Sequence, residues 1–452
     1  MISIPAQNYL NRGFWGDEAW TSLISQLPYL QMLKTTAADF HPPGYYTIIE
    51  LVYIFLPPTE INTRLVSIFF YLATIFMVYK LASYIKGHLF GILSAVVVAL
   101  NPIFFTYAFE ARNYTMFAFA ATGSIFFLLE ISKKFNWFRA LGFVLFTALG
   151  VYTHYYMFFI LGAQGLYLLL FDRKIFIKMM GLYAVVGVLF LPWLPFLYGQ
   201  LTSVKSSYWI PPIDFKNTYF DAFERILGGE AQSIWRTILF SLSLILLFGG
   251  LLGHILKKPT GSNPRFEKTY LLLWLWAIIP FILASLPGLS VFGFKFPFRS
   301  IFFWRYLVGA SIPLSMVMVH GAQKAPKQIF ITSLAILILF SAVIDLQTFS
   351  KHPYSFREAY HEKILPQIKP SDKIVTFLPS FAEVLYYRNR YKLINDLIVS
   401  PEGLVQFSGK SLLDAYSANG IVIIDVAPKT RYFNTDQGQK VDLVTPELIN
   451  NK

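Results

Sequence analysis

The chain contains no cysteine, and only 14% of its 452 residues are charged. The missing thiols exclude a disulfide, a cysteine nucleophile and any metal site built on cysteine, but they do not indicate a compartment. Soluble globular proteins carry about 25% charged residues, so the shortage of charge excludes one large water-soluble enzyme. Because 55% of the residues are hydrophobic, intrinsic disorder is excluded as well.

Several functional motifs are also missing. The sequence contains no glycine-rich phosphate loop of the P-loop or dinucleotide type and no HExxH. The apolar runs lack the repeated acidic residues expected of an ion-coupled transporter. A net charge of +13 would suit nucleic acid on a soluble protein, but on a membrane protein the position of the charges matters more. We therefore expect membrane lipids, and no nucleic acid, as partners.

Long apolar runs fill most of the first 350 residues. A helix needs about 20 mostly apolar residues to cross ~30 Å of hydrocarbon, and about ten runs approach that length. Pro102, near the end of the second run, predicts a kink or a stop there. The predicted spans are 64–84, 89–108, 113–131, 138–153, 155–171, 178–198, 236–256, 269–287, 304–321 and 328–348.

The charges between these runs predict the topology. If the N-terminus lies outside the cytoplasm, every short loop on the cytoplasmic side is basic and the opposite loops are nearly neutral, as the positive-inside rule requires. Both termini, and everything after about residue 350, are then extracytoplasmic. The basic residues are Lys80, Lys86, Lys133, Lys134, Arg139, Arg173, Lys174, Lys178, Lys257, Lys258, Arg265, Lys268, Lys324 and Lys327.

The last hundred residues differ in character. After Lys351 charged residues become common, and the apolar runs at 374–378 and 421–426 have the length of strands. Residues 381–387 and 411–416 are typical of short helices. The predicted architecture is therefore an all-α polytopic membrane protein with about ten transmembrane helices over 1–350, followed by a small extracytoplasmic α/β domain over 351–452.

An acidic pair, Asp17 and Glu18, stands between Trp15 and Trp20 before the first predicted span. Such carboxylates can serve as a general base, or as ligands of a divalent cation such as Mg²⁺ or Mn²⁺. A helix N-terminus flanked by interfacial tryptophan anchors explains the pair equally well.

The motif HPPGYY at 41–46 predicts the start of a helix, because proline is favoured in the first turn. A helix from about residue 43 to 56 is too short to span and would lie in the membrane interface, completing an outer segment over 1–60. Its free N–H groups would offer an anion site near His41 and Tyr45. A simple helix start with a surface histidine remains the alternative.

Other candidates stand at the predicted outer ends of the spans. Ionisable residues near membrane depth are costly, so Glu110 and Arg112 are functional candidates, or else a structural ion pair. His154 lies in an aromatic setting, where a lone histidine is more often structural. Arg305 could reach lipid headgroups or bind a lipid phosphate. The candidate substrate-binding residues are His41, Tyr45, Glu110, Arg112, Tyr114, His154, Arg305 and Tyr306.

Five motifs follow one another along the chain: WGDEAW, HPPGYY, EARNYT, YTHYY and RYL. In this order, and with this topology, the chain resembles the GT-C glycosyltransferases of the protein O-mannosyltransferase and aminoarabinose transferase type, and more closely their RgtA/B/C/D-like branch. The resemblance covers roughly residues 10–320. It implies transfer of a sugar from a polyprenyl-phosphate carrier to a lipid, glycan or protein acceptor at the outer face of the cell membrane, usually with inversion.

The resemblance also implies roles for single residues. Asp17 matches the general base, and Glu18 matches a residue that orients the acceptor or a metal. Glu110, Arg112 and Tyr114 match residues that contact the lipid phosphate or the sugar. Members of the family carry a transmembrane helix before the acidic loop, whereas this sequence begins inside that loop, and residues 1–20 contain no apolar segment that would carry the N-terminus across the membrane.

Two other functions are compatible with the composition. A lipid or glycolipid transporter would place polar or discontinuous helices at the bilayer midplane. Here the polar residues gather at the outer ends of the spans, which favours an enzyme working at the interface. An inactive scaffold with the same fold is the second alternative.

Overall fold

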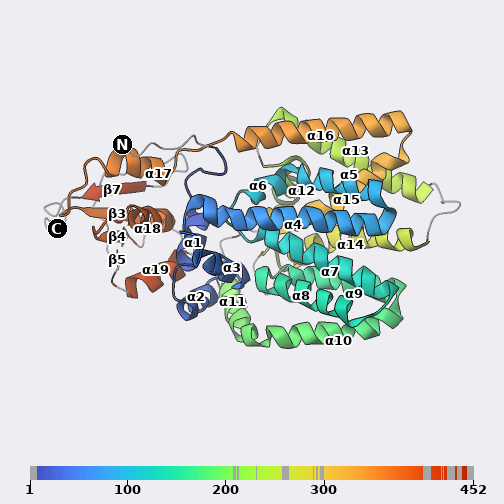
Figure 1. The fold of residues 1–452 in the computed structure, drawn as a ribbon, viewed down its shortest axis with the longest axis horizontal. Coiled ribbons are helices and arrows are strands. Elements are labelled where there is room, and N and C mark those ends of the chain that lie inside the picture. Colours follow the sequence, from blue (N-terminus) through green and yellow to red (C-terminus); the bar gives the residue numbers. More distant parts are fainter. Residues whose placement is uncertain are drawn as a thin grey trace.

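Helices dominate the chain and a small sheet lies near its C-terminal end (Figure 1). The computed structural model describes residues 8–206, 210, 213–230, 232–256, 264–288, 290–291, 294–295, 300–400, 409–418, 420, 422–424, 433–434 and 440–444.

A bundle of mostly long helices occupies one end of the molecule (Figure 1). Within it α4 packs on α5 and α7, α7 packs on α8, and α13 packs on α15. The bundle consists of α4 (Glu60–Lys86), α5 (His88–Ala99), α6 (Pro102–Ala108), α7 (Tyr114–Lys133), α8 (Trp137–Thr153), α9 (Met157–Phe171), α10 (Arg173–Phe190), α11 (Leu194–Ser206), α12 (Asp221–Gly228), α13 (Ile234–Leu256), α14 (Pro264–Ser285), α15 (Ser311–Lys324) and α16 (Lys327–Phe349).

The predicted number of spans is too high. Among the described residues six helices are long and apolar enough to cross a membrane, or seven if the bent pair α5 and α6 forms one span. Two apolar helices, α8 and α9, have only 17 and 15 residues, below the ~20 that a span needs. The predicted span 304–321 begins as a 3₁₀ helix, Trp304–Ala310, before the 14-residue α15. Every predicted run is largely helical, but not every run is a full span.

Local sequence signals set the helix boundaries. Thr59, Asn136 and Asp172 each accept a backbone N–H three residues ahead and so cap α4, α8 and α10. Asn101 caps α6, where Pro102 takes the first helical position, and α5 and α6 meet at an angle of 66°. The kink or stop predicted at Pro102 is confirmed.

Three short helices precede the bundle: α1 (Gly16–Ile24), α2 (Tyr29–Ala37) and α3 (Gly44–Tyr53). The last of these coincides with the helix predicted after HPPGYY. Its ten residues would cover about 15 Å, which is half of a bilayer core. In Figure 1 these helices lie between the bundle and the C-terminal sheet.

The C-terminal region is a mixed α/β unit. Its five described strands have the order β5-β4-β3-β7-β6, in which β3, β4 and β5 are parallel and β7 is antiparallel to β3. The 374–378 strand and the two short helices were predicted; β4 was not. The elements are α17 (Phe356–Ala359), β3 (Lys373–Phe377), α18 (Phe381–Arg390), β4 (Leu397–Ser400), α19 (Gly409–Ala418), β5 (Val422–Ile424), β6 (Phe433–Asn434) and β7 (Lys440–Val444).

The α/β unit shares a hydrophobic core with the N-terminal helices. Buried side chains of α1 and α3, among them Trp20 and Tyr45, belong to the same cluster as Phe381 and Leu397. A second cluster fills the bundle. The chain therefore has two hydrophobic cores. The core outside the bundle, called the outer core below, joins the first fifty residues of the chain to its last hundred.

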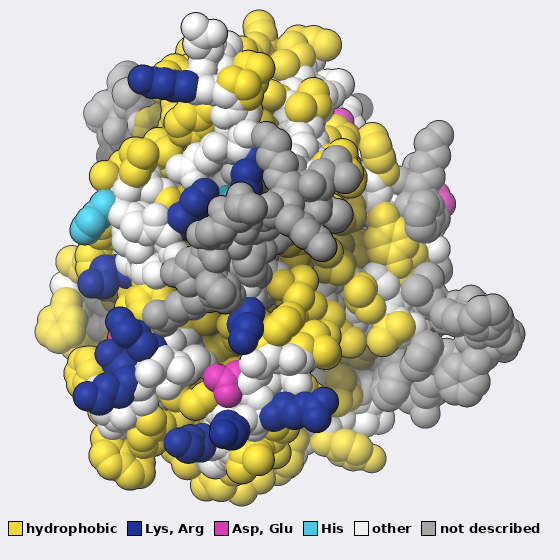
Figure 2. Space-filling model, turned by 90° about the vertical axis from the view of Figure 1, so that its right-hand side faces the viewer, with side chains coloured by type: hydrophobic (Ala, Val, Ile, Leu, Met, Phe, Trp, Pro, Cys, Tyr) yellow, Lys and Arg dark blue, Asp and Glu magenta, His cyan; other side chains and the backbone are white. Residues whose placement is uncertain are grey.

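Basic side chains gather at the end of the bundle opposite the α/β unit. Figure 2 looks at that end and shows lysine and arginine side chains spread over it. The exposed lysines at its helix ends include Lys86, Lys133, Lys134 and Lys327. The alternation seen in the sequence thus corresponds to two chemically different ends of one bundle, while the orientation in the membrane stays a prediction.

Candidate active site

Helix α1 carries the acidic pair and directs its two carboxylates to different places. The Asp17 side chain is 29% exposed, whereas the Glu18 side chain is fully buried. Consecutive residues leave a helix about 100° apart, so one can face a cavity while the other faces the core. The two carboxylates, for which the resemblance implied different roles, therefore also have different surroundings.

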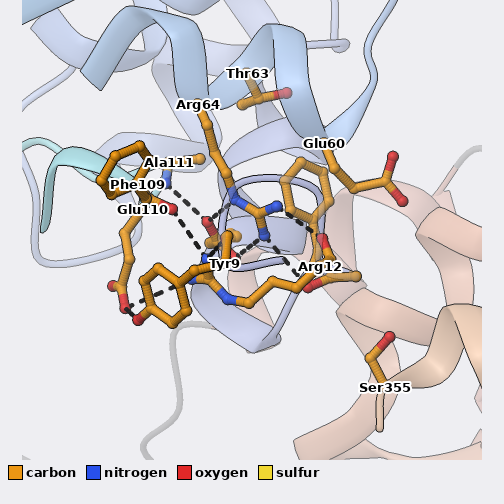
Figure 3. A network of polar contacts seen from close by, with 12 residues as sticks. Tyr9, Arg12, Glu60, Thr63, Arg64, Phe109, Glu110, Ala111 and Ser355 are labelled. Atoms are coloured by element: carbon orange, nitrogen blue, oxygen red, sulfur yellow. Dashed lines mark hydrogen bonds and ion pairs between the residues drawn. The ribbon is translucent and has the colours of Figure 1, made fainter. Parts of the chain in front are cut away.

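Glu18 accepts hydrogen bonds from three segments of the chain in a buried polar network. Figure 3 shows Arg12, Arg64 and Ala111 of this network. Arg64 of α4 grips Glu18 with two hydrogen bonds, Nε to Oε1 at 2.8 Å and Nη2 to Oε2 at 2.6 Å. The Ala111 N–H donates to Oε1 at 2.9 Å, and Arg12 approaches Oε2 at 3.4 Å. Burial alone would raise the pKa of Glu18, but Arg64 and Arg12 outweigh it and the pKa is lowered.

Arg64 also holds the segment that leads into α1. Its guanidinium donates to the carbonyl oxygens of Leu10 and Arg12, each at 2.7 Å, and of Gly13 at 3.2 Å. All five donors of an arginine fork can thus be used without water. Sequence reasoning missed this residue, although a charge at the start of an apolar run was the available signal.

Asp17 faces two arginines from distant parts of the chain. Its Oδ2 lies 3.7 Å from Arg112 Nη2 and 3.8 Å from Arg305 Nη1. Arg112 follows α6 in the loop before α7, and Arg305 lies in the 3₁₀ turn before α15. The guanidinium of Arg305 also stacks 5.0 Å from the ring centre of Trp15. The structure therefore brings together three of the predicted site residues.

Several donors around Asp17 are buried and have no hydrogen-bond partner among the described residues. They are Trp15 Nε1, Arg112 Nε and Arg305 Nε. A buried N–H without an acceptor costs free energy, so such a group in a native structure calls for an explanation. Two arginines and an indole that keep donors unused form a site prepared for an anion with several oxygens.

His41 links Arg112 to a second carboxylate. Its Nδ1 lies 2.8 Å from Asp39 Oδ2 and its Nε2 lies 3.3 Å from Arg112 Nη2. A carboxylate on one ring nitrogen fixes the tautomer and the ring orientation. His41, predicted from its helix-start motif, thus orients Arg112 and contributes to the wall of the site.

Glu110 lies on the far side of the network and is nearly buried. Tyr9 donates to its Oε1 at 3.1 Å and Arg12 approaches at 3.7 Å, while Oε2 has no partner among the described residues. Burial raises the pKa of Glu110 to about 7, and neighbouring Glu18 and Glu230 add to the rise. The Arg112 N–H donates to the Glu110 carbonyl oxygen at 2.7 Å, but the Glu110 side chain pairs with Arg12, so the alternative of a structural Glu110–Arg112 ion pair is not what the structure shows.

A cavity of about 280 Å³ is lined by His41, which contacts Arg112, and by Tyr306, which follows Arg305 in the chain. His154 and Tyr306 meet in it with ring centroids 5.0 Å apart, and Tyr114 lies 6.5 Å from His154. Tyr45 is instead buried in the outer core, where its hydroxyl bonds Ser67 at 2.6 Å. The lining residues are mostly apolar: Phe40, His41, Pro42, His154, Tyr155, Tyr156, Phe158, Phe159, Leu197, Gln200, Leu201, Val204, Ile301 and Tyr306.

The donor set does not fit a divalent cation. Both oxygens of Glu18 already accept hydrogen bonds from Arg64, and Asp17 faces two guanidinium groups instead of a second carboxylate. Within the described ranges no group of three or more histidine, aspartate or glutamate side chains could hold a metal. The acidic pair is thus not arranged as the two-carboxylate metal site that the sequence left open.

The chain resembles known proteins in part of its sequence and in its fold. Residues 40–198 match the family described as dolichyl-phosphate-mannose-protein mannosyltransferase. No curated protein sequence matches the chain closely enough to be counted as a relative.

Solved structures share the fold at low sequence identity. ArnT from Cupriavidus metallidurans in the apo state is 12% identical with a TM-score of 0.61, and the alignment covers 92% of this chain and 86% of that chain. ArnT bound to undecaprenyl phosphate is 13% identical with a TM-score of 0.59, covering 97% and 96%. The Archaeoglobus fulgidus oligosaccharyltransferase is 14% identical with a TM-score of 0.50, covering 83% of this chain and 58% of that one. The chain is therefore a multi-pass membrane protein with the fold of ArnT, and its residues 40–198 are similar to the dolichyl-phosphate-mannose-protein mannosyltransferase family.

Proposed function

We propose that the protein is a membrane glycosyltransferase that moves a sugar from a polyprenyl-phosphate carrier to an acceptor hydroxyl at the extracytoplasmic face. Asp17 is its general base, and Arg112 and Arg305 bind the phosphate. The sequence resemblance suggests in addition the RgtA/B/C/D-like branch.

One observation carries this proposal: a half-open carboxylate faces two arginines whose donors are not all used. Asp17 lies 3.7 and 3.8 Å from the two guanidinium groups, and each of these keeps a buried Nε–H for which the described residues offer no partner. Phosphate oxygens are the acceptors that an arginine fork prefers. A carboxylate beside a phosphate site is the arrangement needed to activate a hydroxyl next to a leaving phosphate.

The reaction is a single displacement at the anomeric carbon. The acceptor oxygen forms a bond to that carbon while the bond to the phosphate oxygen breaks, and Asp17 takes the hydroxyl proton. The electron pair leaves with the carrier phosphate, whose growing negative charge Arg112 and Arg305 stabilise. Attack from the face opposite the phosphate inverts the anomeric configuration.

The neighbouring cavity suits a lipid-linked donor. Its wall is largely aromatic and aliphatic, with His41, His154 and Gln200 as the polar exceptions. Binding sites for small molecules are commonly apolar with a few placed polar groups that fix orientation. The solved ArnT structure with undecaprenyl phosphate supports a carrier of this class.

Replacement of Asp17 by asparagine tests the proposal. Asp17→Asn keeps the shape and removes the base, so turnover in proteoliposomes should fall by about 10²- to 10⁴-fold. The binding of undecaprenyl phosphate should stay near that of the wild type. Glu50→Gln is the control, because Glu50 on α3 is a carboxylate that makes no ion pair with the described residues. A folded Asp17→Asn protein with normal turnover would overturn the assignment.

Arg305→Ala tests the proposed phosphate-binding role. The same assays distinguish the glycosyltransferase from a lipid transporter and from an inactive scaffold. This change should weaken undecaprenyl phosphate binding, with turnover falling because the donor is lost. Arg225→Ala is the matched control. The Arg225 guanidinium stacks 4.7 Å from the ring centre of Trp304, but it pairs with Asp221 of its own helix. Movement of the intact sugar lipid across the bilayer without sugar transfer would instead identify a transporter, and neither activity would indicate a scaffold.

A further inference from the structure

The segment that leads into α1 is pressed against the C-terminal α/β unit. A Cβ atom added at Gly13 would lie 1.9 Å from Ser355 Oγ and 2.9 Å from Tyr387 Oη. A side chain at this position would collide with the side chains of Ser355 and Tyr387, so their close packing against the backbone of residue 13 favours glycine here. Arg357 beside Ser355 donates to the carbonyl oxygen of Asn11.

Tyr387 of α18 bridges this segment to the bundle. Its hydroxyl accepts from the Phe14 N–H at 2.8 Å and donates to Glu60 Oε1 at 3.0 Å, and the side chain is fully buried. The next residue, Tyr386, packs its ring 4.7 Å from the ring of Phe14. One hydroxyl thus connects the start of α1, the start of α4 and α18.

Other contacts hold α1 at both of its ends. The Glu383 carboxylate lies beside Gly16, where an added Cβ would meet its Oε1 at 3.4 Å. A negative charge next to the first turn of a helix is stabilising. At the other end, Tyr416 of α19 donates to the Leu23 carbonyl oxygen at 3.1 Å. The α/β unit therefore supports the back of the helix while Asp17 faces Arg112 and Arg305.

We infer that the C-terminal α/β unit is a positioning element for the reaction, and that Tyr387 is the residue through which it holds Asp17 against the two arginines. The inference rests on the proposed role of Asp17. Tyr387 contacts neither Asp17 nor the arginines, so it acts through the backbone of residues 13–17. A displacement of about 1 Å in a reacting group can cost 10²-fold in rate.

The test compares two buried tyrosines of the same unit. Tyr387→Phe removes the bridging hydroxyl and keeps the ring. Tyr360→Phe is the control, because its hydroxyl is equally buried and donates to the Val384 carbonyl oxygen at 2.8 Å within the unit. Tyr387→Phe should lower kcat about tenfold or more with the KM for the donor within twofold, and Tyr360→Phe should leave both near wild type. Equal losses in the two variants, or none in Tyr387→Phe, would overturn the inference.

A double variant shows whether Tyr387 acts through Asp17. In the Asp17→Asn background, adding Tyr387→Phe should lower kcat little further, because the base it positions is already gone. A further loss as large as that in the wild-type background refutes the mechanism. Normal turnover of Asp17→Asn alone refutes instead the proposed function, so the two failures are distinguishable.

Hydrogen exchange gives a readout that needs no activity. The amides of Glu18 and Ala19 both donate to the Trp15 carbonyl oxygen, at 2.9 and 3.0 Å, and so report the first turn of α1. Their exchange should speed up in Tyr387→Phe and not in Tyr360→Phe. Unchanged protection in Tyr387→Phe would show that the hydroxyl does not hold α1.

Discussion

Asp17 and Glu18 are neighbours in the chain, yet their different surroundings indicate different roles. Glu18 is held by Arg64 in a network without exposure to solvent, and Asp17 is 29% exposed and faces two arginines. Removing one partner of a buried ion pair typically costs 3–5 kcal/mol, because the other charge is left uncompensated. We therefore expect the loss of Glu18 to lower stability, and the loss of Asp17 to lower turnover under the proposed function.

Glu110 predicts a pH dependence of stability. Burial raises its pKa to about 7 from an ordinary value of 4.5, so the folded state holds this proton more tightly than the unfolded state. The resulting stabilisation is complete below about pH 4.5 and is lost as the pH rises through about 7. Glutamine in Glu110→Gln is neutral at every pH. The variant should therefore not show this pH-dependent loss in the free energy of unfolding, which reaches about 3 kcal/mol at pH 8 in the wild type.

The check is the thermal midpoint of both proteins between pH 4.5 and 8 in detergent. The thermal midpoint of Glu110→Gln should rise relative to that of the wild type as the pH rises. A constant gap across this range would mean that Glu110 does not titrate there.

The helices show which parts of the fold follow from the sequence. Apolar runs bounded by Thr59, Asn101, Asn136 and Asp172 locate the bundle helices within a few residues, because length and caps are local properties. Whether a run crosses the membrane is not local, and the short helices α8 and α9 were therefore counted as full spans. β4 was missed because four residues between two helices carry no periodic signal of their own.

Helix α16 contains a carboxyl group that costs stability. Asp345 is 3% exposed, and neither oxygen has a hydrogen-bond partner in the described part of the chain. Burying a polar group without a partner costs about 1–3 kcal/mol. Asp345→Leu, which keeps the branching at Cγ and removes the polar oxygens, should raise the thermal midpoint, and Asp345→Asn should raise it less. A lower midpoint in Asp345→Leu would show that the carboxyl is bonded in the membrane-embedded protein.

At the scale of the molecule, the two ends of the bundle differ in charge, and only one of them carries the candidate site. The basic end has exposed lysines such as Lys134, and the other end carries the candidate site and the α/β unit (Figures 1 and 2). The absence of native cysteine makes the orientation directly measurable. Lys410→Cys on α19 should react with a membrane-impermeant maleimide in sealed right-side-out vesicles, and Lys134→Cys only after permeabilisation. The reverse pattern would invert the proposed topology.

The candidate site was predictable in its residue types and only partly in its assembly. Asp17, Arg112 and Arg305 each stood out as a charge near a span end, and the structure brings them together. The partners of Glu18 and Phe14 did not stand out, since Arg64 lies 46 residues away from the first and Tyr387 lies 373 residues away from the second. Contacts of that separation depend on the packed fold and leave no mark on local sequence.

The close fit between Gly13 and Ser355 has a consequence for the order in which the protein matures. A ribosome adding about 5–20 residues per second needs roughly 20–75 s to travel from Phe14 to Tyr387, the two partners 373 residues apart. Throughout that interval the segment before α1 has been synthesised, but the α/β unit that it contacts has not. The nascent chain therefore cannot complete its reaction centre until its last hundred residues have been synthesised and have joined that segment. Under the proposed function, a chain whose synthesis stops within the bundle would lack the unit that positions Asp17 and should not transfer sugar.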